Sequence, residues 1–119
     1  MHLAIRASGL ALLVSILAVG CGSTQSDSSA PAGASGITIT RAFTFDPTQL
    51  SVDRGTAVTW TNTDMITHTV TSGAPGSPTG KFDKQVEAGG TFTFTFADAG
   101  TYEFFCNIHR SMNGTVVVK

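Results

Sequence analysis

Residues 91–96 read TFTFTF, and this strict alternation of threonine and phenylalanine is the clearest structural signal in the chain. Successive side chains point to opposite faces in a β-strand, so the segment predicts a strand with one apolar and one polar face. The same period of two recurs on both sides of it, in residues 37–39, 58–60 and 102–106. No segment carries the sustained 3.6-residue stripe of an amphipathic helix.

Turn-forming residues separate these runs, as in Asp46-Pro47, Gly89-Gly90 and residues 98–100. Seven or eight short strands at this spacing predict an all-β fold, a sandwich of two packed antiparallel sheets. We expect a bulge or a change of sheet where Arg41 interrupts the alternation. We also expect the hydroxyl of Tyr102 to bond back to the backbone as a tyrosine corner.

The first 20 residues have the features of an export signal. A start with His2 and Arg6 and no acid precedes an apolar run at 10–19 that is too short to span a membrane. Residues 17–21 read LAVGC and resemble a bacterial lipobox, which implies that Cys21 receives a lipid and becomes the mature N-terminus. The alternative is an ordinary signal peptide that happens to contain a cysteine.

Three regions follow from this pattern. Residues 1–20 are predicted to be a lipoprotein signal peptide, 21–36 a flexible tether and 37–119 a single folded domain. The tether is rich in Ser, Gly and Ala and has no large apolar side chain, so it lacks the material for a core. We expect an exported protein, anchored by lipid to the cell membrane on its periplasmic or extracellular face.

The overall composition bears on partners. The chain of 119 residues has a formal net charge of −1, and 13% of its residues are charged. It therefore lacks the basic footprint of a nucleic-acid-binding protein. We expect a monomer that meets other proteins and, through its lipid, the membrane.

A small set of residues can carry chemistry. After removal of the signal, the histidines are His68 and His109, and Cys106 is the free thiol if Cys21 is lipidated. A disulfide between the two cysteines is the competing use. Cys106, His109 and Met112 form a C-x2-H-x2-M loop between two strand-like segments, and His68 lies near the start of another strand. Two imidazoles, a thiolate and a weak thioether are the ligands of a blue-copper electron-transfer site.

Residues 60–73, WTNTDMITHTVTSG, and residues 99–119, AGTYEFFCNIHRSMNGTVVVK, resemble the cupredoxin family, the plastocyanin and amicyanin type in particular. The resemblance covers 37–119. It implies a Greek-key sandwich with one type 1 copper that alternates between Cu(I) and Cu(II), in a mobile carrier of single electrons that is not an enzyme. It assigns the two imidazole ligands to His68 and His109, the thiolate to Cys106 and the axial thioether to Met112. Its partners would be redox proteins.

The chain departs from these relatives around the second histidine. They usually have proline there, whereas Ile108 has an N–H that we expect to donate to the sulfur of Cys106. We expect the hydroxyl of Thr69 to tie the two ligand loops together. Met65 and Ile66 are either core residues or, with Ile108, an apolar docking patch.

Three other functions compete with the electron carrier. A lipoprotein for copper storage, delivery or sensing would use the same ligands. A hydrolase or thiol enzyme would use Cys106 and His109, although no third group that would orient the histidine is evident. A metal-free adhesion sandwich would use none of these residues.

Overall fold

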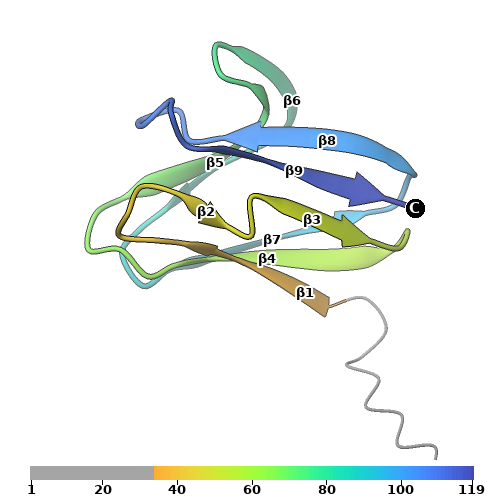
Figure 1. The fold of residues 1–119 in the computed structure, drawn as a ribbon, viewed down its shortest axis with the longest axis horizontal. Helices are drawn as coiled ribbons and strands as arrows, with labels where there is room; N and C mark the ends of the chain where they lie inside the picture. The colour runs from red at the N-terminus through yellow and green to blue at the C-terminus, as the bar shows by residue number, and fades with distance from the viewer. Residues whose placement is uncertain (1–33) are drawn as a thin grey trace, which may run out of the picture.

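The computed structural model describes residues 34–119, which form nine β-strands in two sheets packed face to face (Figure 1). The first sheet has the order β2 (Phe45–Asp46), β1 (Ala34–Ile39), β4 (Thr56–Asn62) and β7 (Thr91–Phe96). The second has the order β3 (Gln49–Val52), β9 (Asn113–Val118), β8 (Gly100–Phe105), β5 (His68–Ala74) and β6 (Ser77–Val86). This arrangement confirms the all-β sandwich. Among the described residues, no helix has the length and hydropathy needed to cross a membrane.

The sheets differ from the expected ones in strand number and direction. Nine strands replace the predicted seven or eight, because two short strands, β2 and β3, flank Pro47. The sheets are also not purely antiparallel: β1 pairs with β4, and β3 with β9, in parallel. The chain changes sheet between β2 and β3, so each parallel pair is joined by a crossover through the other sheet, as parallel neighbours require.

The interruption at Arg41 is a tight turn within one sheet, so the expected bulge or change of sheet at this residue is wrong. Strand β1 ends at Ile39, and β2 folds back on it with Ile39 opposite Phe45. The N–H of Thr40 donates to the carbonyl of Thr44 at 2.9 Å and closes the turn. At the other end of β1, residues 34–36, which we placed in the tether, pair with β4.

The alternating segment at 91–96 forms β7 and confirms the prediction made from its period. Its threonines are exposed and its phenylalanines are buried or half-buried, and Phe92 and Phe96 pack with Trp60 of the neighbouring strand β4. Trp60 is fully buried, and its ring lies 5.3 Å from that of Phe104 and 5.6 Å from that of Phe92. Burial of each large apolar side chain stabilises the fold by about 1.5–3 kcal/mol. The packed core therefore holds the strands, and with them the residues at the strand ends, in fixed positions.

The tyrosine corner is present. The hydroxyl of Tyr102 donates to the backbone carbonyl of Asp98 at 2.8 Å. This bond fixes the connection between β7 and β8, at the end of β8 from which the strand runs toward Cys106.

The pairing of β5 with β8 decides which residues meet at the opposite end. The two strands are antiparallel, with Thr71 opposite Phe105 and Ser72 opposite Phe104. Continued by one residue, this register sets Cys106 opposite Val70, so His68, two residues along β5 on the same face, is the diagonal neighbour of Cys106. Residues 106–112 connect β8 to β9 at this same end of the sandwich (Figure 1).

Candidate metal centre

Three of the four predicted ligands bring their donor atoms together at this end. The Nδ1 atoms of His68 and His109 lie 3.3 Å apart, and each lies 3.8 Å from the Sγ of Cys106. Every edge of this triangle is shorter than twice the ~2.0–2.3 Å bonds that imidazole and thiolate form with zinc, an ion of similar size to copper. A single ion can therefore touch all three atoms. His68 and Cys106 are fully buried, and His109 is half-buried.

The fourth predicted ligand, Met112, closes the loop that carries two of the others. Its N–H donates to the carbonyl of His109 at 2.9 Å, and its carbonyl accepts the N–H of Cys106 at 3.0 Å. The Met112 side chain is buried and belongs to the same apolar cluster as Cys106. Two imidazoles, a thiol and a thioether are therefore gathered around one short loop and the start of β5.

Two backbone N–H groups face the sulfur of Cys106. They belong to Thr69, at 3.3 Å, and to His109, at 3.5 Å. The expected donor, Ile108, is wrong by one residue, because the turn of the loop directs the N–H of His109 rather than that of Ile108 toward Sγ. The expected role of Thr69 is confirmed, since its hydroxyl accepts the N–H of Asn107 at 2.7 Å and ties β5 to the ligand loop.

The ring nitrogen of His68 that faces away from Cys106, Nε2, has a carboxylate partner that was not predicted from the sequence. The Nε2 of His68 lies 2.9 Å from the Oδ2 of Asp64. This bond, more than the N–H that Met65 donates to the same carboxylate, holds the pKa of Asp64 below its usual value. The one hint in the sequence was an acid four residues before a predicted ligand, in a turn.

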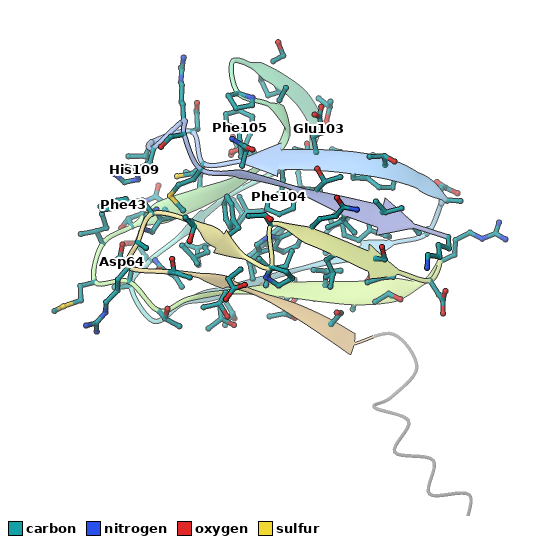
Figure 2. All side chains as sticks on the ribbon, in the orientation of Figure 1. Phe43, Asp64, Glu103, Phe104, Phe105 and His109 are labelled. Carbon is teal, nitrogen blue, oxygen red and sulfur yellow. The ribbon has the colours of Figure 1, made fainter. Side chains whose placement is uncertain are left out.

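An aromatic ring covers the two imidazoles and was also missed. Phe43 lies edge-on to His109, with 5.0 Å between ring centroids, and edge-on to His68 at 6.0 Å. Figure 2 shows Phe43, Asp64 and His109 at the same end of the sandwich. Phe43 has a φ of 58°, a left-handed conformation that is uncommon for a residue other than glycine. The turn after β1 therefore holds this ring over the site at some conformational cost.

Large apolar side chains are exposed around the site. In residues 34–119 these are Phe43 at 45%, Met65 at 76%, Ile66 at 42% and Ile108 at 54% exposed. We call these four residues the apolar patch. Each is in the turn that carries Phe43, in the turn before His68 or beside His109, so the reading of Met65 and Ile66 as core residues is wrong.

Comparison with known proteins agrees with the chemistry of these donors. Residues 32–119 match the family of copper binding proteins described as plastocyanin/azurin. The chain is 31% identical to amicyanin-alpha of Methylorubrum extorquens over 114 residues, which are 95% of each protein. It is 40% identical to halocyanin of Natronomonas pharaonis over 80 residues, 65% of this chain and 49% of that protein.

Solved structures agree with the fold. A purple cupredoxin from Nitrosopumilus maritimus superposes with a TM-score of 0.66 at 30% identity, covering 71% of this chain and 99% of that one. A methionine-to-alanine variant of amicyanin in the Cu(I) form gives 0.61 at 27% identity, covering 72% of this chain and 82% of the other. Since thiolate, thioether and imidazole donors together suit copper, the site, the fold and the sequence agree. The chain belongs to the plastocyanin/azurin family of copper-binding proteins, the cupredoxins, and is a copper electron-transfer protein like amicyanin and plastocyanin rather than an enzyme.

Proposed function

We propose that His68, Cys106, His109 and Met112 hold one type 1 copper, and that the chain carries single electrons at the outer face of the cytoplasmic membrane. The observation that carries this proposal is the triangle of two Nδ1 atoms and one Sγ, with edges of 3.3 and 3.8 Å. A copper ion bound there supplies the one-electron couple between Cu(I) and Cu(II).

The residues around the triangle fix its shape. His68 is held by Asp64, the Cys106 sulfur faces two N–H groups, and the loop to Met112 is closed by two backbone bonds. Side chains held in this way move little when the charge at the site changes. Small rearrangement favours fast electron transfer, because preorganised groups need not reorient at the moment of reaction.

The same residues would serve copper storage, delivery or sensing, and the burial of the ligands supports one of the two uses over the other. His68 and Cys106 are fully buried, and Phe43 covers both imidazoles. Transfer of an ion to another protein needs access to the ligands, whereas an electron can pass through the half-buried ring of His109. This favours the carrier over copper handling.

Replacement of the thiol tests the ligand set directly. The full chain loaded with Cu(II) should show an intense visible absorption band from the thiolate–copper bond, and Cys106→Ser should lose it entirely. Ser111→Ala, a change in the same loop that removes no proposed ligand, should keep the band. An equal band in Cys106→Ser would contradict the proposal.

The axial position can be tested through the reduction potential. Met112→Gln exchanges a soft thioether for a hard amide oxygen, which favours Cu(II) and should lower the midpoint potential. Each tenfold gain in the preference for Cu(II) lowers it by about 59 mV. Met65→Gln makes the same chemical change at an exposed methionine and should leave the potential almost unchanged. Equal potentials in all three proteins would remove Met112 from the ligand set.

The apolar patch is proposed as the surface that meets redox partners, because Phe43 packs against the half-buried His109 and Ile108 precedes it in the chain. Ile108→Glu should slow electron self-exchange between the Cu(I) and Cu(II) forms severalfold, since two like charges must then be brought together and desolvated. Self-exchange has no driving force, so a change of potential cannot cause the effect. Thr101→Glu, at the other end of β8, is the matched control. The patch has no such role if the two variants exchange at the same rate.

The lipid anchor is proposed from the signal-like N-terminus and the cysteine that follows it, which lie outside the described residues. Two or more acyl chains would hold the protein on a membrane, whereas one chain alone is marginal. The part of the predicted tether that precedes β1 would then give the domain room to reach its partners.

Replacement of Cys21 tests this anchor. In a bacterial host the full chain should sediment with membranes and carry the added mass of lipid, while Cys21→Ser should be recovered in the soluble fraction. Visible spectra of the two should agree, since Cys21 is not a proposed copper ligand. A wild-type chain whose mass shows no lipid would overturn the anchor and leave the copper site untouched.

A further inference from the structure

We propose that Asp64 is a positioning residue that sets the electronic character of the copper site: its carboxylate fixes the tautomer of His68 and keeps the reduction potential low. The inference rests on the proposed assignment of His68 as a ligand. It extends that assignment by naming a residue that acts on the copper through the ligand.

The two nitrogens of His68 face different partners. Nδ1 faces the other donors, 3.8 Å from the Sγ of Cys106 and 3.3 Å from the Nδ1 of His109, while Nε2 lies 2.9 Å from the Oδ2 of Asp64. An ionised carboxylate can only accept a hydrogen bond, so the nitrogen that faces it, Nε2, carries the proton, and Nδ1 keeps its lone pair. Such a bond orients a ligand ring and raises its basicity.

The carboxylate is itself held in place. The Oδ1 of Asp64 accepts the N–H of Met65 at 2.7 Å, and the N–H of Asp64 donates to the Oδ1 of Asn62 at 2.9 Å. Asn62 is fully buried, and its Nδ2 donates to the carbonyls of Ile66 at 2.8 Å and Val86 at 3.0 Å. The turn is thus bonded within itself and to the end of β6, so the position of Asp64 is set by the fold.

The charge of Asp64 is close to the site and only partly exposed to water. The His68 side chain is fully buried and that of Asp64 is 10% exposed, and within residues 34–119 no lysine or arginine forms a salt bridge with this carboxylate. Arg41 is close enough to act on this charge, but its Nε donates to the carbonyl of Thr63 at 3.4 Å and not to the carboxylate. In surroundings of low dielectric constant, an anion placed this way stabilises the more positive form of its neighbour. Cu(II) carries one more positive charge than Cu(I), so the carboxylate favours the oxidised form.

The decisive experiment compares midpoint potentials of copper-loaded protein by voltammetry. Asp64→Asn removes the charge but leaves an oxygen that can accept the Nε2 proton. It should weaken the binding of Cu(II) relative to that of Cu(I) by about tenfold, the lower end of the effect on metal affinity expected for residues that support metal ligands. For a one-electron couple this is a rise of about 59 mV. Asp64→Glu, which keeps the charge, should lie nearer to the wild type.

Asp98→Asn is the matched control for net charge. It lies before β8, at the opposite end of the strand from Cys106, and makes the same change in total charge. Its potential should equal that of the wild type. An intact visible band with an equal potential in Asp64→Asn would overturn the role of Asp64 and leave the copper site standing. A wild-type chain with no visible band would instead contradict the proposed function.

A second measurement needs no variant and so does not depend on whether Asp64→Asn folds. In the diamagnetic Cu(I) protein, nitrogen-resolved proton spectra of the histidine side chains should show a slowly exchanging proton on the Nε2 of His68, because that proton is buried and bonded to the carboxylate. A His68 ring without a proton on Nε2, or with one that exchanges as fast as solvent-exposed imidazole, would overturn the proposal.

Discussion

The antiparallel pairing of β5 with β8 is the constraint on which the site depends. The register places Thr71 opposite Phe105 and Ser72 opposite Phe104. The residue after β8, Cys106, and the first residue of β5, His68, are therefore diagonal neighbours on one face of the sheet. A slip of one residue would turn every side chain of β5 to the opposite face, and the imidazole of His68 would leave the sulfur of Cys106. The Thr69 N–H that faces that sulfur and the hydroxyl bonded to Asn107 depend on the same register.

The core makes this register firm. Trp60 on β4 packs against Phe92 on β7, in its own sheet, and against Phe104 on β8, in the other sheet. This contact packs the two sheets together at the strand that pairs with β5. A displaced β8 would expose large apolar area, which costs about 25 cal/mol for each Å². The ligand loop therefore starts from a strand that cannot shift without opening the core. The loop itself has only seven residues, 106–112, and two backbone hydrogen bonds hold its conformation.

The sequence predicted what is periodic or local. The alternation at 91–96 identified a strand and its inward face, and the spacing of Cys106, His109 and Met112 identified a loop suited to a metal. The period of two does not say which strand lies beside which, so the parallel neighbours of β1 and β9 were not predictable from it. Phe43 was missed for a related reason, since its contact with His109 spans 66 positions and arises from an unusual turn conformation. The donor to the sulfur was misplaced by one residue because a loop's N–H directions depend on dihedral angles that composition does not reveal.

The two imidazoles have different surroundings, and the difference suits a carrier. His68 is fully buried and bonded to an anion, whereas His109 is half-buried, packs against Phe43 and follows the exposed Ile108. A group that tunes the charge balance of the copper works best where little water screens it, which is the buried side of the site at His68. A group that passes electrons to a partner must reach the surface, which is the side of His109. The reduction potential is then set through His68 and the contact with the partner is made at His109. Because these are different ligands, residues at the contact surface can change to suit a partner without changing the potential.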